Sequence, residues 1–139
     1  MSSGIIAPVV ALVCWSLVIW LWMYLRRIPA MLKAGIKPQD AAFPGSLDVL
    51  PNGARQAANN YNHLMEQPTI FYAAALAIAV AGHGDGWSVH FAWVYVGLRV
   101  LHSLVQVTVN IVNLRFLLFL ASTIVLAVMV VRECVKIWG

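Results

Sequence analysis

The sequence predicts an all-α fold, an integral membrane bundle of four helices. Of the 139 residues, 62% are hydrophobic and only 10% are charged, and the mean hydropathy is +0.83. Soluble domains contain about half apolar and about a quarter charged residues. A spanning helix needs about 20 apolar residues, so a chain of this length holds at most about four or five spans and no sizeable soluble domain. Four apolar blocks, separated by segments rich in helix breakers, fit that limit.

The first predicted helix covers about residues 5–25. Trp20 and Trp22 lie toward its end, as aromatic residues do near a membrane interface, and Arg26 and Arg27 end the apolar block. No basic residue precedes the block and no small-residue cleavage site follows it, so we expect a retained helix and no removable signal peptide.

A long loop is predicted over about residues 26–52, because proline and glycine are too dense there for one continuous helix. This loop and the start of the next helix contain five basic residues: Arg26, Arg27, Lys33, Lys37 and Arg55. The connection between the second and third helices contains none, so the positive-inside rule places the long loop in the cytoplasm and both termini outside it. Arg132 and Lys136 oppose this rule and are partly offset by Glu133.

The second predicted helix covers about residues 53–81, of which only 67–81 is fully apolar. Pro68 removes one backbone hydrogen bond, so we predict a bend just beyond Glu66. The third and fourth helices are predicted over about residues 88–109 and 114–135.

Polar side chains within these helices form three clusters. One face of the second helix carries Asn59, Asn62, His63 and Glu66, and one face of the third carries Arg99, His102 and Gln106, at helical spacings of three, four and seven. Arg115 lies alone at the start of the fourth helix. An ionisable group in a membrane helix costs about 2.5 to 3.5 kcal/mol, so we predict that none of these faces lipid.

Depth in the membrane predicts that two clusters meet. At about 1.5 Å per residue, Glu66 lies about 22 Å from the outer end of its helix, and Arg99 to His102 lie about 16 to 21 Å from theirs. We therefore predict an ion pair between Glu66 and Arg99, with Arg115 nearer the cytoplasm.

Each of these features has a purely structural alternative. The pair between Glu66 and Arg99 can fix helix register, His102 can be a hydrogen-bonded core histidine, and Arg115 can anchor its helix at the headgroups. No cysteine or second carboxylate completes a coordination sphere around His63 and His102, so we expect no metal site. The two cysteines lie in apolar runs and imply no disulfide.

Three segments carry a resemblance to a known family. NNYNHLMEQPTIFY at residues 59–72, WVYVGLRVLHS at residues 93–103 and NLRF at residues 113–116 resemble the membrane-associated proteins in eicosanoid and glutathione metabolism, the MAPEG family, and in particular its bacterial branch. The resemblance covers about residues 54–131. It implies four-span subunits that form homotrimers, with glutathione bound between subunits near the cytoplasmic side, and a place in a bacterial inner membrane.

The resemblance also assigns roles to residues. Glu66 matches the glutamate of the family's second helix, and Arg99 and His102 match its Arg-x-x-His motif. Arg115 matches the arginine that stabilises the glutathione thiolate in enzymes of the family, which makes it the candidate catalytic residue.

Several positions depart from the family's pattern. His63 replaces an asparagine, Asn59 and Asn62 replace arginines, and Gln106, Phe116 and Phe119 replace polar or tyrosine residues of the pocket. Losing two arginines removes charge-assisted hydrogen bonds of about 1.5 to 3 kcal/mol each to the carboxylates of glutathione.

Two functions from different classes follow. The first is a glutathione-dependent transferase or peroxidase that acts on a lipophilic small molecule from the bilayer. The alternative, favoured by Phe116 and Phe119, is a non-catalytic trimer that binds lipid or serves as a scaffold. A small transporter is a third hypothesis. The sequence shows no inverted repeat, which argues against it. The basic residues lie beside membrane segments, so we expect no nucleic acid partner.

Overall fold

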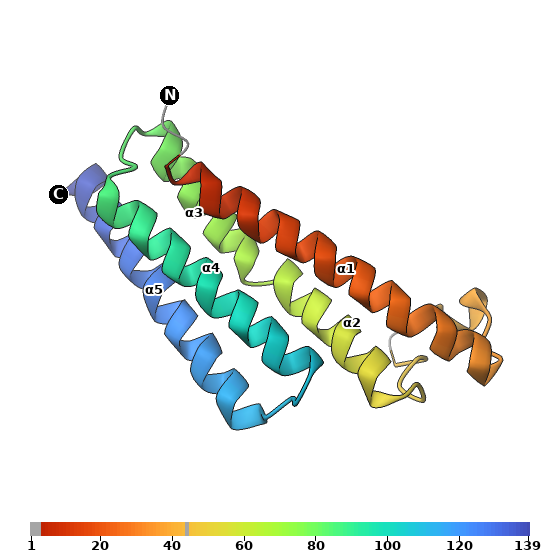
Figure 1. The fold of residues 1–139 in the computed structure, drawn as a ribbon. Coiled ribbons are helices and arrows are strands. Elements are labelled where there is room, and N and C mark those ends of the chain that lie inside the picture. Colours follow the sequence, from red (N-terminus) through yellow and green to blue (C-terminus); the bar gives the residue numbers. More distant parts are fainter. Residues whose placement is uncertain (1–3, 44) are drawn as a thin grey trace.

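The computed structural model describes residues 4–43 and 45–139, and these fold into a bundle of α-helices. The elements in chain order are α1 (Ile6–Ala34), the 3-10 turn η1 (Pro38–Ala41), α2 (Asn52–Met65), α3 (Pro68–Val80), α4 (Gly86–Val107) and α5 (Val112–Trp138). Figure 1 shows α1, α4 and α5 running along the bundle, with α2 and α3 following one another beside them. The bundle is elongated, as a membrane-spanning unit should be.

Three of these helices, α1, α4 and α5, are long and apolar enough to cross a membrane. Large apolar side chains cover their outward surfaces; on α5 they include Leu117, Leu120, Ile124, Val128 and Val131. Lipid tails solvate such a surface at no cost, whereas water does not. The chain is therefore built to sit among membrane lipids.

The first helix is longer than the sequence predicts. It was expected to end near residue 25, but α1 includes Arg26, Arg27 and Pro29 and ends at Ala34. Arginine is a good helix former, and the helix continues through Pro29 although an interior proline removes one backbone hydrogen bond and crowds the carbonyl one turn earlier. The helix stops at Gly35, whose φ of 71° allows its N–H to bond back to the carbonyls of the last turn. The loop is correspondingly shorter than 26–52.

The predicted bend beyond Glu66 is confirmed, and it is a full break between two helices. α2 ends at Met65 and α3 begins at Pro68, so the predicted helix over 53–81 is divided. The proline ring would collide with the carbonyl of Leu64 in a continuous helix, and at the first position of α3 its missing N–H costs nothing. Because of this break, the residues after it face a different direction from those before it.

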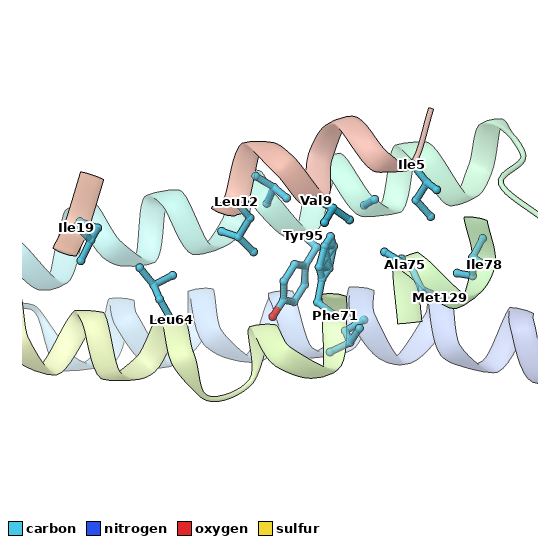
Figure 2. Close-up of a cluster of buried hydrophobic side chains, with 13 residues drawn as sticks. Ile5, Val9, Leu12, Ile19, Leu64, Phe71, Ala75, Ile78, Tyr95 and Met129 are labelled. Carbon is cyan, nitrogen blue, oxygen red and sulfur yellow. The ribbon is translucent and has the colours of Figure 1, made fainter. Parts of the chain in front are cut away.

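A cluster of buried hydrophobic side chains, drawn in Figure 2, forms the main core of the bundle. Leu12 and Ile19 of α1, Leu64 of α2 and Phe71 of α3 are almost fully buried. Phe71 stacks on Tyr95 of α4 with ring centroids 4.5 Å apart. These contacts fix α1 and α4 against the broken α2–α3 pair on both sides of the break.

Candidate functional site

The polar face of α4 lies inside the bundle, as predicted. Arg99, His102 and Gln106 are 1%, 4% and 1% exposed. Their spacing of three and seven places them on one side of the helix, and the apolar residues of α4 cover the other sides. The interior of this membrane bundle therefore contains a line of polar groups.

Arg99 is held by an amide. Its Nη2 donates to Oε1 of Gln67, which also accepts from the hydroxyl of Tyr95 at 3.3 Å. Nε2 of Gln67 donates to Oγ1 of Thr123 at 2.8 Å, so one glutamine joins α4 to α5. Nε and Nη1 of Arg99 have no partner among the described residues. The guanidinium also lies 4.9 Å from the ring centre of Phe119.

The predicted ion pair between Glu66 and Arg99 is wrong. The Glu66 side chain is 70% exposed, and its one ion-pair contact within the described chain is His63, at 3.9 Å. The break at Pro68 explains the difference, because it turns Gln67 toward Arg99 and leaves Glu66 on the outer surface. The predicted pairing assumes that residues 53–81 form one straight helix. A break in that helix changes which side chain points inward.

The inward amide of α2 is Asn60, which is not among the residues predicted from the sequence. Asn60 is fully buried and its Nδ2 donates to Oε1 of Gln106 at 2.9 Å. Asn59 and Asn62 instead lie exposed on the surface of the bundle. Because Asn59 and Asn60 are adjacent, helical spacing alone does not predict which of the two points into the bundle.

His63, His102 and Arg115 come together around one cavity of about 260 Å³, here named the Arg115 cavity. The other lining residues are Val112, Phe116 and Phe119. The rings of His63 and His102 lie 5.7 Å apart at an angle of 72°. Three elements, α2, α4 and α5, thus each contribute a polar side chain to a cavity whose remaining wall is apolar.

The charge in this cavity comes from Arg115. Its Nε is buried and has no hydrogen-bond partner within residues 4–43 and 45–139. A buried donor without a partner costs about 1 to 3 kcal/mol, more when it is charged, so a ligand anion at this position would satisfy a group that the chain leaves unpaired. The guanidinium can stabilise a thiolate or another small anion, and the aromatic and aliphatic wall can hold an apolar group beside it.

Two other predicted site residues belong to a second cavity. Asn59 and Asn62 line a space of about 410 Å³ between α1, residues 41–43 and 45–50, and α2, here named the loop cavity. Arg27 and Arg55 also line it. The predicted polar residues are therefore divided between two cavities. Gln106 lies in neither, because it is buried between α2 and α4, and Glu66 lies on the outer surface.

The opposite end of the bundle carries a charged cluster whose members pair with one another, although Nη1 of Arg132 is buried without a hydrogen-bond partner among the described residues. Nδ1 of His83 lies 2.5 Å from Oε1 of Glu133, and Asp85 contacts Arg132 at 3.2 Å and Lys136 at 3.1 Å. A hydrogen bond from the backbone N–H of Ser88, together with the two cations, lowers the pKa of Asp85 well below its usual value. This cluster ties the turn before α4 to the end of α5.

No metal site is found within the described residues, where no three His, Cys, Asp or Glu side chains gather. Cys14 is exposed and Cys134 is half-buried, and both are free.

Comparison with known proteins identifies one family. The profile of the MAPEG family matches residues 5–133, which is nearly the whole chain. No curated protein and no solved structure matches.

Proposed function

The chain belongs to the MAPEG family, and from this membership and the Arg115 cavity we propose that it is a glutathione-dependent membrane enzyme acting on a lipophilic substrate. The reaction is transfer of glutathione to an electrophile or reduction of a hydroperoxide. The observation that carries the proposal is the unpartnered guanidinium nitrogen of Arg115, which lies in a cavity whose other walls are histidine, phenylalanine and valine.

Arg115 acts in this proposal by favouring the ionised thiol. A fixed positive charge lowers the pKa of a nearby thiol, and the thiolate is the reactive form. In transfer, the thiol proton leaves to water, the thiolate forms a carbon–sulfur bond, and the leaving group departs with its electron pair. In reduction, two glutathione thiols are oxidised to a disulfide while the hydroperoxide becomes an alcohol and water. Phe116 and Phe119 provide the surface for the lipophilic partner.

His102 and Arg99 are positioning residues in this scheme. His102 lies between His63 and Phe119, with ring centroids 5.7 and 6.4 Å away, and so fixes the wall of the cavity. Arg99 lies behind Phe119 and is held there by Gln67. Neither residue needs to touch the thiol to keep Arg115 and Phe119 in place.

The two carboxylates of glutathione find no cation besides Arg115 among the residues that line this cavity. We propose that a homotrimer completes the site, with a neighbouring subunit covering the open side. An exposed charge supports this assembly, because Glu66, at the break between α2 and α3, is 70% exposed on a membrane bundle. The basic end would face the cytoplasm of a bacterial inner membrane, with both termini on the other side.

The assembly is tested by the mass of the purified protein in a mild detergent. A trimeric mass is expected, and a monomeric mass at concentrations well above those of the assay would contradict the shared site.

The activity is tested by glutathione binding and turnover. Saturating glutathione, at about a hundred times its dissociation constant, should stabilise the detergent-purified protein by about 2.7 kcal/mol. The protein should also conjugate glutathione to a lipophilic aryl halide or reduce a lipid hydroperoxide. If glutathione neither shifts the unfolding temperature nor reacts, the enzyme proposal is wrong and the non-catalytic lipid-binding subunit replaces it.

A further inference from the structure

Two of the six side chains that line the Arg115 cavity can both accept and donate a proton near neutral pH. They are His63 of α2 and His102 of α4. The other four cannot, because three are apolar and the guanidinium of Arg115 does not release its proton. Proton transfer between a ligand and the wall of this cavity therefore depends on an imidazole.

The two histidines differ in their surroundings. Nδ1 of His63 lies 3.9 Å from Oε2 of Glu66, and the His63 side chain is 39% exposed, so it can also exchange protons with water. His102 is 4% exposed, with Arg99 one turn earlier on the same face of α4. Within residues 4–43 and 45–139, His102 forms no ion pair with a carboxylate. A carboxylate stabilises an imidazolium and a guanidinium opposes it, so His63 is the better proton carrier of the two.

A thiolate in the cavity would strengthen this preference. Arg115 and a charged His63 line the same cavity and repel each other. A thiolate between them supplies the negative charge that both cations need, and imidazolium groups are known to pair with thiolates in this way. Glu66, His63 and the thiol would then follow the order of carboxylate, histidine and nucleophile found in catalytic triads.

From this arrangement we propose that His63 is a catalytic residue that gives a proton to the oxygen leaving a lipid hydroperoxide, and that Glu66 is its positioning residue. The inference rests on the proposed function, and it names lipophilic hydroperoxides as the substrate class. The apolar surface of Phe116 and Phe119 suits the hydrocarbon part of such a substrate.

The proton that His63 donates comes from glutathione. The thiol gives it to Nε2 of His63 and remains as a thiolate beside Arg115. The thiolate attacks the terminal oxygen of the hydroperoxide, so a sulfur–oxygen bond forms while the oxygen–oxygen bond breaks. The departing alkoxide takes the proton from His63 and leaves as the alcohol. A second glutathione thiol converts the resulting sulfenic acid to the disulfide and releases water, so sulfur is oxidised and the peroxide is reduced.

A proton donor matters only where the leaving group is a strong base. An alkoxide is such a group, whereas the halide that leaves an aryl halide needs no proton. The two reactions also share the thiolate that Arg115 stabilises. Loss of His63 should therefore slow hydroperoxide reduction and spare conjugation, whereas loss of Arg115 should slow both.

The experiment compares both reactions in the purified full-length protein and in His63→Asn. The rate of reduction of a lipophilic alkyl hydroperoxide should fall by about 100-fold or more, and the rate of conjugation to a lipophilic aryl halide should change by less than about twofold. The matched control is His90→Asn, an exposed histidine near the start of α4, which should change neither rate. Equal losses in both reactions of His63→Asn, or no loss in reduction, would overturn the inference.

Glu66→Gln tests the positioning residue. Hydroperoxide reduction should fall by about threefold to tenfold, with the aryl halide reaction unchanged. Across a series of alkyl hydroperoxides, the loss in Glu66→Gln and in His63→Asn should grow with the basicity of the departing alkoxide. A purely structural defect would lower every rate by the same factor, and that result would contradict the assignment. If His63→Asn unfolds at a markedly lower temperature, Glu66→Gln carries the test, because its side chain is 70% exposed.

Failure of this inference can be told from failure of the proposed function. A protein that conjugates glutathione but does not reduce hydroperoxides would overturn the role of His63 and leave the transferase proposal in place. A protein that catalyses neither reaction would overturn both.

Discussion

At the end of the bundle where α3 turns into α4, every charged side chain contacts a partner, whereas the lysines and arginines described at the basic end form no ion pair. The paired end consists of Asp85 with Arg132 and Lys136, and of Glu133 with His83. The basic end has six of the nine Lys and Arg residues, namely Arg26, Arg27, Lys33, Lys37, Arg55 and Arg115, and in the described chain none of these six forms an ion pair.

This difference separates stability from binding. A charge that is satisfied within the chain stabilises the fold and has little left to offer a ligand, whereas an unpaired guanidinium in a cavity can gain its partner from a ligand. The Arg115 cavity, proposed above as the thiol site, lies at the basic end. Substitutions at the two ends should therefore change different measurements.

The largest effect is expected for Arg115→Leu. Removing the charge that stabilises the thiolate should lower the rate of glutathione conjugation by about 100-fold or more, since a preorganised charge or donor at a reacting group contributes that much. The matched control is Arg132→Leu, which removes the same side chain at the paired end and should leave the rate unchanged. Equal losses of rate in the two variants would contradict the proposed difference between the two ends of the bundle.

A smaller effect, on stability alone, is expected for His83→Ala. The Glu133 carboxylate, which is 11% exposed, would lose its partner, and the free energy of unfolding should fall by about 2 kcal/mol. The measurement is chemical unfolding in detergent, with the Glu133→Ala variant and the double variant completing a cycle. Simple additivity in that cycle would show that the two side chains do not interact.

Asp85 should make the stability of the paired end depend on pH. Its pKa is lowered in the folded protein, first by the N–H of Ser88 and then by Lys136 and Arg132. The stabilisation is therefore complete above the pKa of an unfolded aspartate, about 3.9, and is lost as the pH falls through the lower folded-state pKa. The unfolding temperatures of the protein and of Asp85→Asn should differ most at about pH 6, and the difference should shrink steadily as the pH falls below about 3.9. A constant difference would contradict this assignment.

The smallest effect is expected for Glu66→Gln. This side chain is 70% exposed and does not contact Arg99, so in a single subunit the substitution should change the free energy of unfolding by less than about 0.5 kcal/mol. Gln67→Leu, one position away, should cost several times more because it leaves Arg99 without its hydrogen bond. The comparison requires detergent conditions in which the protein is monomeric. Equal effects of the two substitutions would restore Glu66 as the partner of Arg99.

Some of these features could be predicted from the sequence. The inward face of α4 could be predicted because Arg99, His102 and Gln106 are polar residues at helical spacing in a helix that is otherwise apolar. The position of the break was predictable from Pro68, whose effect is local and steric.

Other features could not be predicted. α2 carries amides on more than one side, so its spacing did not show that Asn60 points inward and that Asn59 and Asn62 do not. The pairing of His83 with Glu133 joins residues 50 positions apart, and it depends on the relative lengths of three helices. Gln67 was overlooked because the direction of a side chain next to a helix break is set by tertiary packing.

The most direct test of the central proposal is the ultraviolet absorption of glutathione bound to the purified protein at neutral pH. A thiolate absorbs where a thiol does not, so the ionisation that Arg115 is proposed to cause can be observed without turnover or a substrate. We expect a thiolate band with the unmodified protein and none with Arg115→Leu at glutathione concentrations that saturate both. Saturating binding without a thiolate band, or an undiminished band in Arg115→Leu, would contradict the account.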